Sequence, residues 1–331
     1  MGNSRLVLIL LCVGLITVCM AGCGAGSAGD SSGENVVADE TAAADTAVQT
    51  NDENAGNTVV QTGDENTGVH SAAEEQNDPE LSASGETEEV LLKGLGLSIL
   101  GDSISTFDGW IPAGYAVFFP LDGNVTNVSQ TWWMQLLKDT EMELCSNSSS
   151  SGSTCVGDSF SIDDPKYGCG GYRISSLAGK QGTMPDIIIV YMGTNDMLMG
   201  IPLGDNDGTK LVEEGVIENF SDAYCLILDK LASEYPVAEI YCCTLLPVGD
   251  WGVDEPFVNF TNGIGLTSED YSNRIQTIAG NKGVSVIDLY HCGVGIDNLD
   301  VMTSDGVHPT PEGMKCIEQA VLNAVKGSGD K

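Results

Sequence analysis

The stretch GLGLSILGDSIS, residues 94–105, carries the strongest structural signal in the chain. Its apolar part, 97–100, has the length and composition of a buried strand. Gly101 and Asp102 end this run, and Ser103 follows them directly. Open α/β sheets bind ligands at the carboxyl ends of their strands, so Ser103 is a candidate functional residue.

The tripeptide Gly-Asp-Ser also occurs at 29–31 and at 157–159, so its context must be weighed. The copy at 29–31 lies in a polar tract, and with Gly33 it also matches G-x-S-x-G, a pattern that requires a strand, a turn and a helix around it. The copy at 157–159 lies in a loop rich in Gly, Ser and Asp. Only Ser103 follows a strand-like run, so the other two copies are read as turns.

The rest of the chain after residue 90 alternates between strand-like and helical patterns. Strands are predicted at 97–100, 142–145, 186–191, 239–245 and 284–289. Helices are predicted at 130–138, 216–234, 268–279 and 311–325, the last with Thr310 as its cap. Continuous apolar strands alternating with helices predict an α/β fold with a central parallel sheet covered on both faces.

Three polar blocks recur after predicted strands or near the end of the chain. They are NSSSSGST at 147–154, GTND at 193–196 and DGVHP at 305–309. Ser103, Gly152 and Asn195 each follow a predicted strand, so a parallel sheet would bring them to one edge.

These blocks supply the groups that ester hydrolysis by a serine requires. Ser103 is the candidate nucleophile, and its hydroxyl needs a base in contact with it. His308 is the candidate base, because an imidazole both removes and returns a proton near neutral pH. Asp305 lies three residues before it and is the candidate for orienting the imidazole. Of the two other histidines, His70 lies in a polar region and His291 is expected to be structural or at the surface.

The order and context of these blocks resemble the SGNH (GDSL-type) hydrolase family, over about residues 95–326. The resemblance implies a flavodoxin-like three-layer α/β/α sandwich. It also implies an oxyanion hole made by the backbone N–H groups of Ser103 and Gly152 and by the side-chain amide of Asn195. Arg173 lies where the family often carries an arginine, and a structural ion pair is expected for it. Asp102 and Asp196 are expected to brace loops.

Aromatic residues in two long loops are candidates for lining the substrate site. The first loop, 107–120, contains Trp110 and Tyr115, and the second, 247–265, contains Trp251. Such rings could stack on sugars or line an acyl pocket, or they could pack the loops onto the domain. Trp132 and Trp133 lie in a predicted helix and are expected in the core.

The amino terminus has the pattern of an export signal. Arg5 precedes an apolar run at 6–20, which is short for a membrane span and is followed by Ala21-Gly22-Cys23. The cysteine after Ala-Gly resembles a bacterial lipobox. We therefore expect a lipoprotein signal peptide at 1–22 and lipidation of Cys23, with an ordinary signal peptide cleaved nearby as the alternative.

Residues 24–90 contain no Lys, Arg, Cys or aromatic residue and carry 16 acidic residues. High charge with little to bury predicts disorder, so 23–90 is read as a lipidated cysteine followed by an acidic tether. A specific binding tail is the alternative. Residues 91–331 are then the SGNH-type hydrolase domain.

Charge and cysteine content exclude several classes of function. The whole chain has a net charge of −35, and the domain alone has 32 acidic against 12 basic residues. Nucleic acid binding requires clustered Lys and Arg, so it is not expected. The cysteine spacing contains no CxxC pair and no metal site is expected. Cys145, Cys155 and Cys169 flank Gly152, and the sequence leaves open whether two of them form a disulfide.

The sequence thus predicts an exported, membrane-anchored serine esterase that needs no cofactor. Its expected substrate is a small acyl ester, acetyl foremost, on a carbohydrate or small molecule, and its only expected membrane contact is the lipid anchor. One alternative is a lipolytic esterase or thioesterase for longer acyl chains. Another is a tethered lipoprotein that binds a glycan or solute without catalysis, which would leave Ser103, Asp305 and His308 unexplained.

Overall fold

A parallel sheet forms the centre of the part of the chain that the computed structural model describes, residues 92–250 and 257–327. Its five strands lie in the order β2-β1-β4-β6-β7, and each pairs in parallel with its neighbours. They are β1 (Gly96–Gly101), β2 (Glu143–Ser149), β4 (Ile187–Tyr191), β6 (Glu239–Cys243) and β7 (Ser285–Ile287). This is the doubly wound order of flavodoxin-like folds, in which the chain reverses direction across the sheet next to β1.

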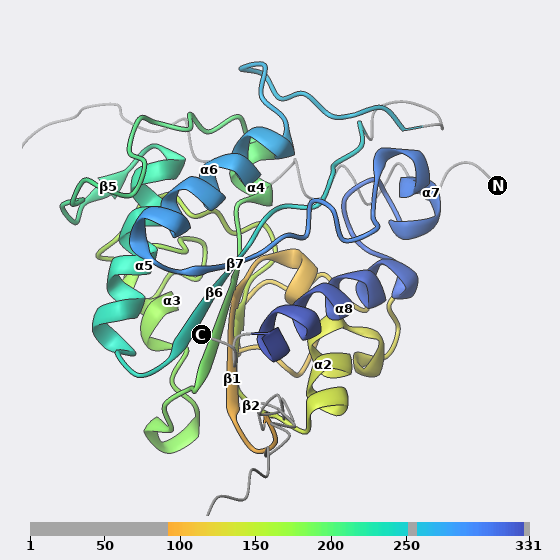
Figure 1. The fold of residues 1–331 in the computed structure, drawn as a ribbon, viewed down its shortest axis with the longest axis horizontal. Helices are drawn as coiled ribbons and strands as arrows, with labels where there is room; N and C mark the ends of the chain where they lie inside the picture. Colours follow the sequence, from red (N-terminus) through yellow and green to blue (C-terminus); the bar gives the residue numbers. More distant parts are fainter. Residues whose placement is uncertain (1–91, 251–256, 328–331) are drawn as a thin grey trace, which may run out of the picture. The chain divides into compact units, whose positions relative to one another are not determined.

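Helices cover both faces of this sheet (Figure 1). One face is covered by α2 (Trp132–Thr140) and α8 (Pro311–Gly327). The other is covered by α3 (Gly171–Ser175), α5 (Phe220–Glu234) and α6 (Ser268–Lys282). The three-layer α/β/α architecture predicted from the sequence is therefore confirmed.

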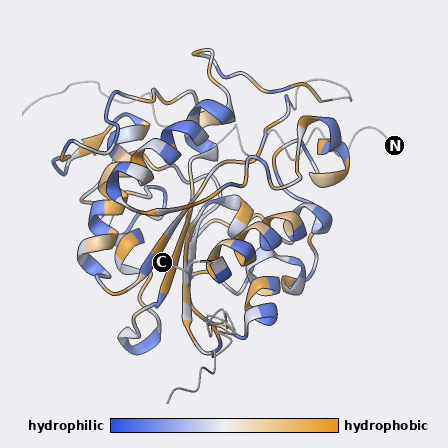
Figure 2. Ribbon diagram, in the orientation of Figure 1, coloured by the Kyte–Doolittle hydropathy of each residue, from blue (hydrophilic) through white to orange (hydrophobic). Residues whose placement is uncertain are grey.

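The side chains of β4 show how one strand serves two cores. Ile188 and Val190 pack with α5 and α6, whereas Ile187, Ile189 and Tyr191 pack with α2 and α8. All five are buried, which explains why the strand is apolar along its whole length rather than alternating. Figure 2 shows hydrophobic residues along the central strands and hydrophilic residues on the outward faces of the helices.

The strand and helix bounds differ from the predicted ones at particular places. β2 runs on to Ser149, beyond the predicted end at 145, because its polar residues still pair with β1. The helix predicted from 216 begins at Phe220, so this part of the prediction is wrong. Val216–Ile217 instead forms β5, which pairs antiparallel with β3 (Gly157–Asp158). Asn219 then caps α5 by accepting a hydrogen bond from the Asp222 N–H.

Short elements complete the fold. Two further short helices are α4 (Thr194–Leu198) and α7 (Leu299–Met302). Four 3₁₀ turns are η1 (Ser103–Ser105), η2 (Val128–Gln130), η3 (Lys180–Gly182) and η4 (Ile296–Asn298). The predicted cap of α8 is confirmed, because the Thr310 hydroxyl accepts from the Gly313 N–H at 3.4 Å.

Several predictions lie outside the described residues. They are the signal peptide, the lipidation of Cys23, the acidic tether and the aromatic candidate Trp251. Within the described part of the chain, no helix combines the length and apolar character that a membrane crossing requires. The eight cysteines of that part, Cys145, Cys155 and Cys169 among them, are free thiols.

Candidate active site

Ser103, Gly152 and Asn195 follow three neighbouring strands at one edge of the sheet. Ser103 comes after β1, Gly152 after β2 and Asn195 after β4, and β1 lies between the other two strands. The direction of the chain across the sheet changes at β1, where open α/β sheets leave a crevice beyond their strand ends. The fold therefore brings these three residues to the place where such a sheet binds its ligand.

The turn that carries Ser103 is built by the residues around it. Asp102 is fully buried and accepts a hydrogen bond from the Ile104 N–H at 3.1 Å, which caps η1. Burial raises the pKa of Asp102 to about 6. At Gly101 a Cβ atom would lie 2.5 Å from the Ser149 hydroxyl, so only glycine fits there. Ser103 itself is 6% exposed.

Ser103, His308 and Asp305 form a continuous hydrogen-bonded chain. The Ser103 Oγ lies 2.9 Å from the His308 Nε2. The His308 Nδ1 lies 2.8 Å from the Asp305 Oδ2. This is the arrangement in which a base can take the serine proton while a carboxylate holds the tautomer of the base.

Asp305 is held within its own turn. Its Oδ1 accepts hydrogen bonds from the backbone N–H groups of Val307 at 3.0 Å and His308 at 2.8 Å. Burial alone would raise the pKa of Asp305, but the charge of His308 and these hydrogen bonds outweigh it and lower the pKa below its usual value. Gly306 has a φ of 88°, which favours glycine, and its carbonyl accepts from the Gly249 N–H at 2.9 Å.

The three donors expected to bind an oxyanion lie in the segments that follow β1, β2 and β4. The backbone N–H groups of Ser103 and Gly152 donate to no acceptor in the described residues. Gly152 has a φ of 73° and lies exposed beside the site. The Asn195 amide gives one N–H to the Ser153 carbonyl at 2.9 Å, which orients the group and leaves its second N–H for a ligand.

Asp196, in the second polar block, binds the residues that directly follow the first block. Its two carboxylate oxygens accept hydrogen bonds from the N–H groups of Cys155 at 2.8 Å and Val156 at 3.2 Å. Complete burial raises the pKa of Asp196 to about 7 in spite of these donors. The bracing role predicted for Asp102 and Asp196 is confirmed by these contacts.

The raised pKa of Asp196 has a consequence for stability. A carboxyl that ionises near 3.8 when unfolded and near 7 when folded retains its proton longer in the folded state. The free energy of unfolding should therefore fall by about 4 kcal/mol as the pH rises through this window. Asp196→Asn should remove this decrease, which urea unfolding across the pH range measures.

Asp207→Asn serves as a control, because the pKa of Asp207 is shifted in the opposite direction to that of Asp196. Hydrogen bonds from Thr209 lower the pKa of the exposed Asp207, so its contribution to stability is lost as the pH falls. The Asp196 prediction would be wrong if wild type and Asp196→Asn lost stability equally between pH 4 and pH 8.

The contacts of Arg173 differ from the ion pair predicted for it. The sequence suggested an ion pair, but no carboxylate in the described residues lies within salt-bridge distance of it. Its fully buried guanidinium instead donates to the carbonyls of Gly101 at 2.7 Å, Ser148 at 2.6 Å and Pro165 at 2.5 Å. Burial lowers the pKa of Arg173 to about 10. It thus ties the ends of β1 and β2 together directly behind the nucleophile.

The aromatic residues of loop 107–120 pack mainly against the protein. Trp110 is 43% exposed, and its ring centroid lies 5.8 Å from that of Trp133. Tyr115 is 6% exposed, and its hydroxyl donates to the Ser176 Oγ at 3.2 Å. Trp132 and Trp133 are fully buried in the core, as predicted.

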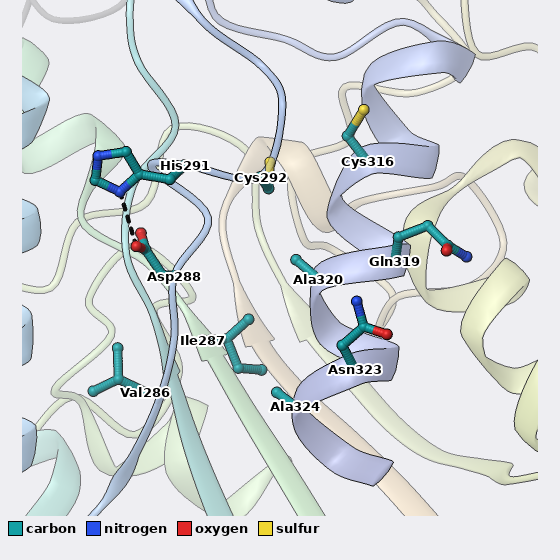
Figure 3. A pocket seen from close by; sticks show the side chains of 10 residues that line it. All are labelled: Val286, Ile287, Asp288, His291, Cys292, Cys316, Gln319, Ala320, Asn323 and Ala324. Atoms are coloured by element: carbon teal, nitrogen blue, oxygen red, sulfur yellow. Dashed lines mark hydrogen bonds and ion pairs between the residues drawn. The ribbon is translucent and has the colours of Figure 1, made fainter. Parts of the chain in front are cut away.

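A second Asp-x-x-His pair, Asp288 and His291, makes no hydrogen bond to Ser103 in the described residues. The His291 Nδ1 lies 2.8 Å from the Asp288 Oδ2, the same separation as in the first pair. The His291 side chain is 71% exposed, against 13% for His308. It borders a cavity of about 370 Å³ beside α8, and Figure 3 shows its ring pointing away from Cys292 and Cys316. As predicted, His291 is a surface residue.

Within the described residues, no group of three or more His, Cys, Asp or Glu side chains could hold a metal ion.

Known proteins match this chain as follows. Residues 95–247 match the family model described as GDSL-like Lipase/Acylhydrolase. A candidate GDSL-like lipase from Bacteroides uniformis is 28% identical, with a TM-score of 0.52 over 71% of this chain and 96% of that chain. A candidate GDSL-like lipase from Bacteroides ovatus is 26% identical, with a TM-score of 0.52 over 71% of this chain and 99% of that chain. A Lactobacillus plantarum protein that is 20% identical shares the fold, with a TM-score of 0.54 over 71% of this chain and 98% of that chain. No curated protein matches the chain.

Proposed function

Since the chain belongs to the family of GDSL-like lipases and acylhydrolases, we propose that it is a serine esterase that removes small acyl groups, acetyl foremost, from carbohydrates outside the cell. The observation that carries the proposal is the unbroken chain from the Ser103 hydroxyl through His308 to Asp305, with contacts of 2.9 and 2.8 Å. A serine without a catalytic role does not require a histidine in contact with its hydroxyl and a carboxylate behind that histidine.

The reaction proceeds in two halves. The Ser103 Oγ attacks the ester carbonyl carbon while the His308 Nε2 takes its proton. The N–H groups of Ser103, Gly152 and Asn195 stabilise the oxyanion that forms. The alcohol leaves with the proton that His308 returns, and the acyl group remains on Ser103. A water molecule, deprotonated by His308, then releases the acid and restores the serine.

The preference for a small acyl group is supported by the packing around the nucleophile. Long acyl chains need an apolar trough with accessible side chains. In loop 107–120, Tyr115 and Phe119 are buried in contacts with the domain, and Trp110 packs on Trp133. Buried rings offer no accessible surface to a long acyl chain, and this supports a short acyl group as the substrate.

The proposed location rests on the amino-terminal sequence. In this proposal the protein is exported and attached to the membrane through lipidated Cys23, with 24–90 as the spacer. A carbohydrate substrate follows from that location, because polymers outside the cell are a common source of acetyl esters for a tethered enzyme.

A series of p-nitrophenyl esters from acetate to octanoate tests the proposal. We expect kcat/KM of the full-length protein to be highest for acetate and to fall at least tenfold by octanoate, with Ser103→Ala as the blank. An acetate preference would be followed by acetylated glycans as substrates. The opposite order would support a lipolytic enzyme, and equal, negligible turnover by both proteins would contradict an esterase of broad acyl specificity.

A further inference from the structure

Phe118 covers one face of the candidate base. The centroids of the Phe118 ring and the His308 imidazole lie 3.5 Å apart, and the two planes differ by 11°. Phe119, which is fully buried, packs edge-on against Phe118 with a centroid distance of 4.9 Å. The ring on His308 is thus backed by the core and does not lie free in the crevice.

The backbone of this segment is fastened to the nucleophile turn. The Phe118 N–H donates to the Thr106 Oγ1 at 3.0 Å, and the same hydroxyl donates to the Ser103 carbonyl at 2.9 Å. On the other side, the Ser151 N–H donates to the Ala116 carbonyl at 2.8 Å. The segment therefore connects the turn of Ser103 with the loop of Gly152 and holds an aromatic ring against the face of His308.

We infer that Phe118 is a positioning residue for the general base, a role that rests on the proposed esterase function: its ring holds the imidazole of His308 between Asp305 and Ser103 and stabilises that imidazole when it is protonated.

The positioning follows from the geometry of the histidine. The imidazole serves both partners in only one ring orientation, because rotation about its Cβ–Cγ bond breaks the contacts to Ser103 and Asp305 together. A flat ring packed parallel to the imidazole opposes this rotation and excludes water from that face.

The stabilisation follows from the charge that His308 gains during the reaction. A cation on the face of an aromatic ring is attracted by the ring quadrupole. The charged groups around His308 are Asp305 in its own turn and Asp102 at the cap of η1, with Arg173 behind Asp102. Phe118 adds an uncharged contribution that favours the same protonated form as the two carboxylates do.

The test compares three variants of the full-length protein. Phe118→Leu keeps an apolar side chain over His308 but removes the aromatic face. Phe118→Tyr retains the face and should restore wild-type behaviour. Phe160→Leu is the matched control, because it makes the same change at a side chain that is 63% exposed in the loop between β3 and α3.

Two measurements read out the role of Phe118. One is the pH profile of kcat/KM for p-nitrophenyl acetate. The other is the NMR titration of the histidine ring signals, which are assignable because the chain has only three histidines, His70, His291 and His308. The NMR measurement needs no substrate, so it decides the inference even if the proposed function fails.

In Phe118→Leu we expect kcat to fall about fivefold. We also expect the acid limb of the profile and the midpoint of the His308 signals to move down by about half a pH unit, because the imidazolium loses a stabilising contact. Phe118→Tyr and Phe160→Leu should stay within twofold of wild type, with midpoints unchanged. An unchanged midpoint in a folded Phe118→Leu protein, whatever its activity, would overturn the inference.

Discussion

Alanine in place of Ser103 is expected to lower kcat for p-nitrophenyl acetate by on the order of 10⁴-fold or more. The variant lacks the atom that forms the acyl-enzyme, so only the oxyanion donors and binding remain. Ser103 is nearly buried, and the loss of one hydroxyl leaves the contacts of the turn in place. The far-ultraviolet spectrum and the unfolding midpoint should therefore match wild type while ester turnover, followed at 405 nm, disappears.

The histidines supply the control for this prediction. His308→Ala should lose activity to a similar degree, and the double variant with Ser103→Ala should be no worse than either single one, since the two residues act as a unit. His291→Ala removes the same kind of side chain from the same Asp-x-x-His spacing and should retain wild-type activity. More than about one tenth of wild-type activity in Ser103→Ala would refute its assignment as the nucleophile.

Asparagine in place of Asp305 is expected to lower kcat by about 10³- to 10⁴-fold. The carboxylate uses one oxygen for the backbone N–H groups of Val307 and His308 and the other for the His308 Nδ1. Asparagine can keep only one oxygen as an acceptor, so its NH₂ group would face the imidazole. His308 would then carry its proton on Nε2, where it could not accept the proton of Ser103.

The second Asp-x-x-His pair again supplies a matched control. Asp288→Asn makes the same change beside His291, at the same 2.8 Å separation, and should leave kcat within about twofold of wild type. Equal losses in the two variants would mean that the Asp305 effect reflects general damage to the fold. A loss below tenfold in Asp305→Asn would mean that the turn alone orients the histidine.

The sequence predicted the layers of this fold well because buried parallel strands carry an unmistakable apolar pattern. It failed where backbone pairing overrides side-chain preference. β2 continues through polar residues to Ser149 because β1 pairs with it, and Val216–Ile217 pairs with Gly157–Asp158 although it reads as the start of a helix. Such pairings depend on partners far away in the chain, which local periodicity does not encode.

The candidate site, too, was only partly predictable from the sequence. Ser103, Asp305 and His308 could be chosen because their residue types and spacing match a known chemistry. The contacts of Arg173 with carbonyl groups and the stacking of Phe118 on His308 depend on how loops close, so they could not be read from spacing. The sequence does contain a second Asp-x-x-His, at 288–291. This repeat shows that the spacing alone does not identify a catalytic pair.

The nucleophile and its base stand 205 positions apart in the chain, one after the second strand of the sheet and the other after its last edge strand. A chain still being synthesised thus has the serine long before it has the histidine. In the proposed function, hydrolytic activity arises only when β7 has docked and the turn before α8 has brought His308 to the residue that follows β1. In the proposed function, ester cleavage consequently reports completion of the whole sheet, and a partly folded chain does not act on acylated molecules.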